Sequence, residues 1–233
     1  MVKDYVCVDI ETSGIRVKWD KIIEIGAVKV RDGKAVDTFS ELINPGLKLS
    51  PYITELTGIT DEMLKDKPFI EEVLPRFIEF TGDDVIMGHN IMFDYSFLKQ
   101  NAINQKLKFD KMGIDTLKIA RRLLPELEHK NLSFLCQYFN IDPGRSHRAY
   151  DDAVSASILY GKLEKLKPED NSFSNTTKLV YVVKKDSPIT PPQRRYLAAL
   201  VEKHNINLEI PVEEMTKSMA SRQIDTIIAQ YGK

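Results

Sequence analysis

Apolar positions follow two different periods along the first 165 or so residues of the chain. Short β-branched or apolar runs predict strands, and apolar positions three and four apart predict helices. The predicted strands are 5–9, 22–30, 35–43 and 85–88, with a fifth short strand ending near residue 115. The predicted helices are 68–81, 93–104, 116–124, 132–139 and 149–166. This alternation is typical of an α/β domain, and Pro75 predicts a kink or a break in the first helix.

The pattern changes after this region. Residues 168–177, PEDNSFSNTT, are polar and rich in turn formers, which predicts a linker, and 179–183 could be a short strand. Residues 190–193, TPPQ, have the form of a capping box with proline at the first helical position. Two amphipathic helices follow, and Gly232 can end the second. We expect a domain over 1–167, a linker over 168–189 and a small helical module over 190–233.

Composition limits the function without naming it. Hydrophobic residues make up 42% of the 233 residues, enough for one substantial core and a small appendage. The charge is balanced, 33 Lys+Arg against 34 Asp+Glu, so any contact with nucleic acid should be local to a site. No apolar run approaches the roughly 18 residues that span a bilayer, and the start lacks a signal-peptide pattern. We expect a cytoplasmic protein without a membrane partner, with Cys7 and Cys136 as buried reduced thiols rather than a disulfide or metal pair.

Acidic residues occupy three separate segments next to predicted elements. Asp9 and Glu11 end the first apolar strand and share one of its faces, where two carboxylates repel unless a cation lies between them. Asp94 falls in the first turn of the helix that follows the strand at 85–88. Asp152 lies on the early turns of the helix 149–166, and His147 precedes it by five residues.

Each segment alone has an ordinary interpretation. The DxE pair could be solvated loop acids, Asp94 could complement the helix dipole, and His147 and Asp152 could be a loop residue and an N-terminal helix acid. Together, four carboxylates could converge on hard divalent cations, which prefer oxygen ligands. Two such ions about 4 Å apart could activate a water and stabilise a leaving oxygen, and a histidine could take the proton. The combination suits metal-assisted hydrolysis of a phosphodiester.

The blocks DIET, HNIMFD and HRAYDDA, in this order, resemble the three exonuclease motifs of the DEDDh, or DnaQ-like, 3′-to-5′ exonuclease superfamily. The resemblance spans residues 4–165 and is supported by IIEIGAVKV, INPG and ITELTGITDEML between the motifs. The sequence is similar to the exonuclease domain of PolC-type polymerases and to the proofreading epsilon subunit of DNA polymerase III. Because these residues include no polymerase portion, we expect a free-standing relative.

This resemblance implies a ribonuclease-H-like fold, a five-stranded mixed sheet with helices on both sides. It also implies two Mg²⁺ or Mn²⁺ ions, with His147 as the general base. Tyr150 does not match the position of the tyrosine that defines the sister DEDDy group. The implied metal ligands are Asp9, Glu11, Asp94 and Asp152. The implied contacts to the terminal nucleotide are Thr12, Asn90, Phe93 and the Gly58-Ile59-Thr60 segment, represented by Ile59.

The function implied is release of nucleoside 5′-monophosphates from single-stranded or frayed DNA 3′ ends, as in replication proofreading or repair. One alternative is an RNA 3′-end trimming enzyme, and another is a non-catalytic nucleic-acid or polymerase-binding module. Presence of all four acids and His147 disfavours the last. Residues 190–233 carry six basic and five acidic residues, a net charge of +1, and resemble a small helical module appended to bacterial and phage proteins. This module could bind a polymerase, another protein or a second copy, position substrate, or act as a passive cap.

Overall fold

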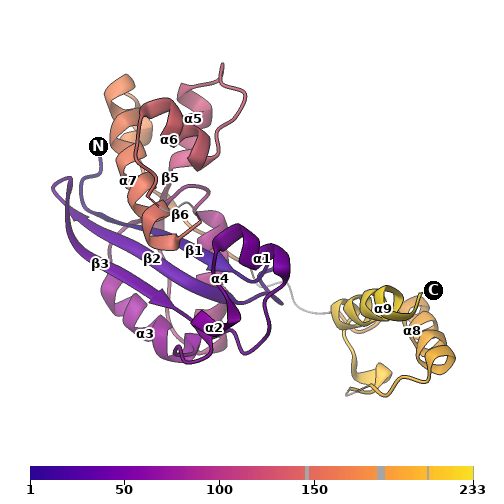
Figure 1. Cartoon of the computed structure of the whole chain (residues 1–233). Coiled ribbons are helices and arrows are strands. Elements are labelled where there is room, and N and C mark those ends of the chain that lie inside the picture. Colours follow the sequence, from indigo (N-terminus) through magenta and orange to yellow (C-terminus); the bar gives the residue numbers. More distant parts are fainter. Residues whose placement is uncertain (145–146, 183–186, 209, 233) are drawn as a thin grey trace. The chain divides into compact units, whose positions relative to one another are not determined.

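The chain forms two compact units, Met1–Tyr181 and Val182–Lys233, in a computed structural model that describes residues 1–144, 147–182, 187–208 and 210–232 (Figure 1). The first unit contains the three motifs. The second contains the predicted helical module. Each unit has its own apolar core, so each is described by itself.

The sheet of the first unit has six strands in the described residues, in the order β3-β2-β1-β4-β5-β6. Strands β1 to β3 form an antiparallel meander, β4 and β5 run parallel to β1, and β6 pairs antiparallel with β5. The sheet therefore has one strand more than the five that were expected. The sixth contains only two residues, too few to show an alternating pattern. The strands are β1 Tyr5–Thr12, β2 Ile22–Arg31, β3 Lys34–Leu42, β4 Ile86–Gly88, β5 Met112–Asp115 and β6 Thr177–Lys178.

Helices cover both faces of this sheet, which gives the expected three-layer, ribonuclease-H-like arrangement (Figure 1). Alternation along β1 decides what each face meets. Val6, Val8 and Ile10 pack in one cluster with α3 and α4, whereas Tyr5 and Cys7 pack with α5, α6 and α7. The helices are α1 Pro51–Thr57, α2 Asp61–Leu64, α3 Ile70–Thr81, α4 Met92–Asn104, α5 Thr116–Leu123, α6 Leu132–Phe139 and α7 Ala149–Leu166.

Helices α1 and α2 were not predicted, because they have seven and four residues, too short for a helical period. Their caps were readable: the side chains of Ser50 and Thr60 accept bonds from backbone N–H groups, and Gly58 ends α1 with φ of 69°. Pro75 lies inside α3 without ending it. Strand β1 continues to Thr12, so the DxE pair lies within the strand and not after it.

The prediction of a linker at residues 168–177 is wrong, because this segment packs on the first unit. Phe173 is fully buried in the α5–α7 cluster, and its carbonyl accepts bonds from the Val2 N–H and the Tyr160 hydroxyl. Leu179 is buried in the other cluster. These two apolar side chains anchor a mainly polar segment, so the first unit ends after Tyr181 and not after residue 167. The short strand expected at 179–183 lies instead at 177–178, and residue 183 is outside the described residues.

The second unit contains α8 Pro191–His204 and α9 Lys217–Tyr231. The predicted capping box is present: the Thr190 hydroxyl accepts from the Gln193 N–H, and the Gln193 side chain accepts from the Thr190 N–H. The Gln193 amide also donates to the Lys217 carbonyl, and Leu197 and Ile227 share one buried cluster. The two helices therefore pack on each other.

Two expectations from composition can be compared with the fold. Cys7 and Cys136 are both buried and free, as predicted. In the part of the chain that the structure describes, no helix has the length and apolarity required for a membrane span.

Candidate active site

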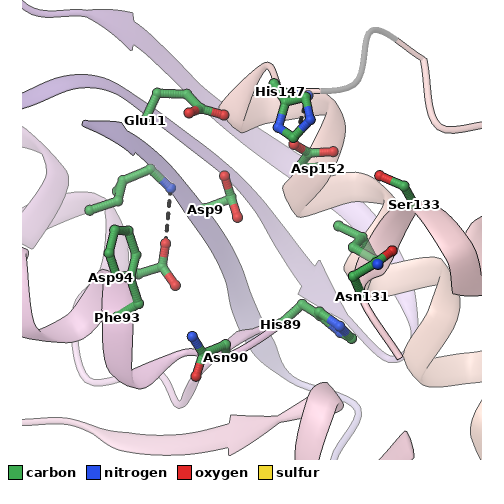
Figure 2. Close-up of a pocket in the computed structure, with 12 residues that line it drawn as sticks. Asp9, Glu11, His89, Asn90, Phe93, Asp94, Asn131, Ser133, His147 and Asp152 are labelled. Carbon is green, nitrogen blue, oxygen red and sulfur yellow. Dashed lines mark hydrogen bonds between the residues drawn. The ribbon is translucent and has the colours of Figure 1, made fainter. Parts of the chain in front are cut away.

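The acidic and histidine side chains of the three motifs line one cavity of about 530 Å³ in the first unit (Figure 2). All three predicted motifs contribute to it, because β1 and the starts of α4 and α7 meet there. The four predicted metal ligands and the predicted base all line this cavity. Its lining consists of Asp9, Ile10, Glu11, His89, Asn90, Phe93, Asp94, Asn131, Leu132, Ser133, His147 and Asp152.

Strand β1 places Asp9 and Glu11 on the face that carries Tyr5 and Cys7, which is the face covered by α7. The strand partner of Asp9 is Gly26 on β2. A Cβ added at Gly26 would lie 2.0 Å from the backbone nitrogen of Tyr150, so the first turn of α7 packs directly on β2 there. The missing side chain lets α7 approach closely enough to carry Asp152 over β1.

Asp94 is held by the backbone of β1. Its Oδ1 accepts a 3.0 Å hydrogen bond from the Ile10 N–H, drawn as a dashed line in Figure 2. The side chain is only 3% exposed, in the first turn of α4. This bond fixes the carboxylate beside Asp9, which is the next residue back along the strand.

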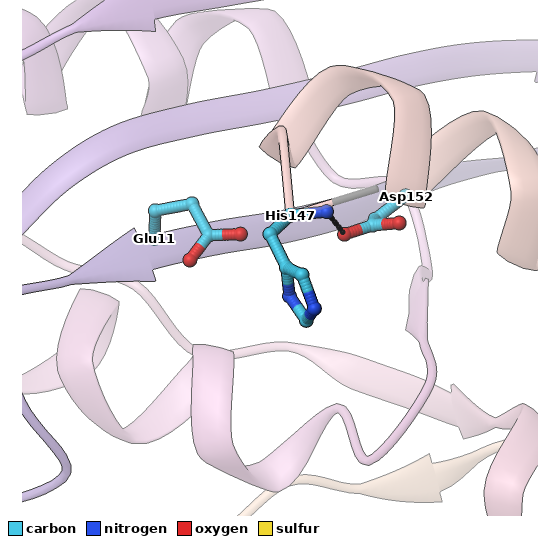
Figure 3. Close-up of side chains that lie close together, drawn as sticks. All are labelled: Glu11, His147 and Asp152. Carbon is cyan, nitrogen blue, oxygen red and sulfur yellow. Dashed lines mark hydrogen bonds between the residues drawn. The ribbon is translucent and has the colours of Figure 1, made fainter. Parts of the chain in front are cut away.

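His147, just before the start of α7, lies between Glu11 and Asp152 in Figure 3. Its backbone N–H donates to Asp152 Oδ2 over 3.0 Å, and its φ of 60° is in the left-handed region. One ligand atom each from Glu11, His147 and Asp152 lies within 4.8 Å of the others. Residues 145 and 146, which precede His147, are outside the described residues.

An ion pair that sequence reasoning missed fixes the start of α7. Glu24 lies opposite Glu11 in the β1–β2 register and is only 1% exposed. Its carboxylate accepts bonds from Arg148 Nη2 at 2.7 Å, from Arg148 Nε at 3.1 Å and from the Ala149 N–H at 3.0 Å. A charged residue inside the apolar run IIEIGAVKV was the available signal, since buried carboxylates require partners.

Burial and mutual repulsion make the cavity costly for negative charge. Burial first, then Asp94 and Asp152, raises the pKa of Asp9 well above its usual range. Burial, with Asp152 and Glu24, raises the pKa of Glu11 to about 8. Burial raises the pKa of Asp94 to about 8 and that of Asp152 to about 6, the latter opposed by His147. Carboxylates that resist ionisation together are a donor set suited to hard divalent cations, which stabilise the ionised form.

Two of the four predicted nucleotide contacts reach the cavity. Asn90 and Phe93 line it. Thr12 is buried, and its hydroxyl donates to the Gly14 carbonyl over 2.6 Å. Ile59 is fully buried in a separate cluster with Ile23 and Leu64. The structure does not bring the side chains of Thr12 and Ile59 into the cavity.

The start of α6 supplies lining residues that the sequence did not reveal. Asn131, Leu132 and Ser133 face the cavity beside His89 (Figure 2). The Asn131 side chain caps α6 by accepting from the Phe134 N–H, a role typical of its residue type. Both ring nitrogens of His89 are bonded, to Thr116 Oγ1 at 2.9 Å and to the Lys130 carbonyl at 2.7 Å.

A model of an exonuclease family, RNase_T, matches residues 6–160, which include strands β2 to β5, the three motifs and most of β1 and α7. The chain belongs to this exonuclease family. The match ends inside the first unit, so it does not include the helices α8 and α9.

Curated relatives of this exonuclease include PolC-type DNA polymerase III proteins. The protein of Clostridium perfringens is 43% identical over 167 residues, 71% of this chain and 12% of the relative. That of Bacillus subtilis is 42% identical over 164 residues, 69% of this chain and 11% of the relative. The chain therefore spans about one-eighth of the length of these relatives.

Solved exonucleases share the fold. Exonuclease X in complex with 5′ overhanging duplex DNA is 28% identical, with a TM-score of 0.55, over 71% of this chain and 94% of that chain. An Escherichia coli exonuclease I–ssDNA complex has a TM-score of 0.66 over 72% of this chain and 42% of that chain. The latter is 18% identical, so it supports the fold alone.

Proposed function

We propose that this exonuclease removes nucleoside 5′-monophosphates from DNA 3′ ends, and that hydrolysis requires two Mg²⁺ or Mn²⁺ ions. The observation that carries the proposal is the convergence of four carboxylates from three motifs, with His147, in one cavity of an exonuclease fold. We propose that this activity serves replication proofreading or DNA repair.

The residues that would hold the ions are Asp9, Glu11, Asp94 and Asp152. Their all-oxygen donor set fits hard divalent cations, and their raised pKa values show that the cavity favours either protons or cations over bare negative charge. Bound there, the ions would lower the pKa of a water and stabilise the leaving oxygen of the phosphodiester. The Ile10 N–H, which holds Asp94, orients one of the four carboxylates before any ion arrives.

His147 is the proposed general base. Its side chain lines the cavity, and Figure 3 shows it next to Glu11 and Asp152. Its neutral imidazole can accept the proton of the attacking water. Its position depends on a backbone bond to Asp152 and, through the next residue, on the buried Arg148–Glu24 pair.

DNA is the proposed substrate because the similar proteins are DNA polymerases and exonucleases solved with DNA. Asn90 and Phe93, on the cavity wall opposite His147, are the side chains available to the terminal nucleotide (Figure 2). An aromatic side chain can stack on any base, which suits an enzyme that removes every nucleotide in turn.

Matched DNA and RNA strands of one sequence test the substrate. Each strand carries a label at its 5′ end and is incubated with Mg²⁺, with Mn²⁺ or with excess EDTA. The expected result is stepwise shortening of the DNA with either ion and none in EDTA. Faster shortening of the RNA would instead support an RNA 3′-end trimming enzyme. If both strands stayed intact, the result would support a non-catalytic binding module.

The role of the second unit stays a prediction. Association with a polymerase, with another protein or with a second copy is consistent with a near-neutral pair of helices that packs around its own small core. We propose protein association for this unit because the net charge of its residues 190–233, +1, is too small for a nucleic-acid arm.

A further inference from the structure

A second cavity of about 490 Å³ adjoins the catalytic cavity. The two share four lining residues, His89, Asn90, Asn131 and Leu132, so a ligand in one can continue into the other. The rest of the second cavity is lined by Leu117, Arg121, Glu128 and Lys130, from α5 and from the segment between α5 and α6.

The second cavity differs from the first in its charge. Arg121 and Lys130 face it against a single acid of the lining, Glu128, whereas the catalytic cavity is dominated by carboxylates. Arg121 is exposed and has no hydrogen bond or ion pair to any described residue, in contrast to Arg122, which pairs with Asp170 at 3.1 Å. Arg121 lines this cavity together with the shared residues His89 and Asn90.

The wall between the cavities is fixed by hydrogen bonds. His89 Nε2 donates to the Lys130 carbonyl over 2.7 Å, and the Thr116 hydroxyl lies 2.9 Å from Nδ1 of the same ring. Asn131 is held as the cap of α6. These bonds hold the backbone of Lys130 next to Asn131, which lines both cavities.

We infer that the second cavity is a subsite for the substrate strand, in which Arg121 and Lys130 bind a backbone phosphate upstream, on the 5′ side, of the scissile phosphate. The inference rests on the proposed function, since the terminal nucleotide must occupy the catalytic cavity. An unpaired guanidinium offers charge-assisted hydrogen bonds to phosphate, and Leu117 and Leu132 offer apolar contact to sugar or base. A strand that runs through both cavities must be single, so a duplex end must fray before it can be cut.

Two substrates separate this subsite from the catalytic site. The first is a single-stranded DNA oligonucleotide. The second is the p-nitrophenyl ester of thymidine 5′-monophosphate, which has no phosphate upstream. For Arg121→Gln, the ratio of kcat/KM on the strand to kcat/KM on the ester should fall about tenfold, as expected for one lost charge-assisted bond. The slope of log(kcat/KM) on the strand against log[salt] should become shallower by about 0.7, the value for one phosphate contact to a single strand.

The matched control is Lys118→Gln, which removes an exposed cation from the same helix that does not line the cavity. The inference is supported if Arg121→Gln changes the ratio and the slope while Lys118→Gln leaves both at the wild-type value. It is overturned if the two variants behave alike. If the wild type hydrolyses the ester with Mg²⁺ and Arg121→Gln has no effect, only the subsite fails; if the wild type hydrolyses neither substrate, the proposed function fails and the subsite with it.

Discussion

Individual carboxylates in the catalytic cavity are ionised at a cost when no cation is present. The pKa of Glu11 and that of Asp94 are both raised to about 8 by burial, against about 4.3 and 3.9 in an unfolded chain. Between these values the folded state binds more protons than the unfolded state, so the free energy of unfolding falls as the pH rises. This fall in the free energy of unfolding extends from about pH 4 to about pH 8.

This linkage predicts how the melting temperature depends on pH. In EDTA, Tm should fall as the pH is raised from about 5 to about 8. Mg²⁺ or Mn²⁺ should raise Tm, and by more at pH 8 than at pH 6, because the ions replace protons that the carboxylates have lost. Thermal unfolding followed by circular dichroism measures both trends, and Asp94→Asn should flatten the fall in EDTA. A larger metal effect at the lower pH would contradict the linkage.

His147 should accelerate hydrolysis without being required for folding or metal binding. His147→Ala should lower kcat by about 100- to 10,000-fold, the usual contribution of a general base. His129→Ala is the matched control, because that imidazole is exposed and outside the cavity. If His147→Ala had the same kcat as the wild type under conditions where chemistry limits the rate, His147 would not be the general base.

The residues with recognisable chemistry were predictable, and those that support them were not. Asp9, Asp94 and His147 stand in motifs whose residue types and spacing point to the reaction. The capping role of Asn131 is local, because its partner Phe134 is three residues away, but its place in the cavity lining depends on how α6 packs. The role of Glu24 requires the strand register and the position of α7, because its partner Arg148 is 124 residues away. Contacts of this kind depend on tertiary structure.

At the scale of elements, the site depends on how closely α7 approaches β2. Gly26→Ala would place a Cβ about 2 Å from backbone atoms of Tyr150 and Ala149, so the start of α7 must move. Overpacking of this kind costs about 1–3 kcal/mol of unfolding free energy, and displacement of His147 and Asp152 by 1 Å can lower kcat about 100-fold.

Urea unfolding and steady-state kinetics measure these two effects of Gly26→Ala. The matched control is Gly161→Ala, within α7 itself, where an added Cβ meets no atom within 4 Å. That substitution should preserve activity and can raise stability, since alanine favours a helix. Equal behaviour of the two variants would show that the contact at Gly26 does not position α7.

Elements with a long apolar period were predicted within a few residues of their observed bounds, as β2 and α7 illustrate. The two-residue strand β6 and the four-residue helix α2 were missed, since neither is long enough to repeat a pattern. The polar composition of 168–177 concealed Phe173, which is buried by long-range packing and not by its neighbours in sequence.

At the scale of the whole molecule, the position of the boundary between the units has a consequence for truncation. A chain of residues 1–182 keeps β6, Phe173 and Leu179 and should fold with its nuclease activity intact. A chain that ends at residue 166 exposes the space filled by Phe173, whose burial alone contributes about 1.5–3 kcal/mol. Circular dichroism melting curves of the two truncations measure this difference. Equal Tm values would instead support the domain boundary after residue 167 that was expected from the sequence.

Metal-dependent hydrolysis from the 3′ end by the four-carboxylate cavity can be tested in one experiment. A 5′-labelled DNA strand is incubated with the wild type and with Asp9→Asn, in Mg²⁺ and in excess EDTA, and the products are separated by length. We expect a ladder that shortens one nucleotide at a time only for the wild type in Mg²⁺, with turnover lower by several orders of magnitude in a folded Asp9→Asn variant. A full ladder in EDTA or from Asp9→Asn, or immediate release of the 5′ label as a mononucleotide, would contradict it.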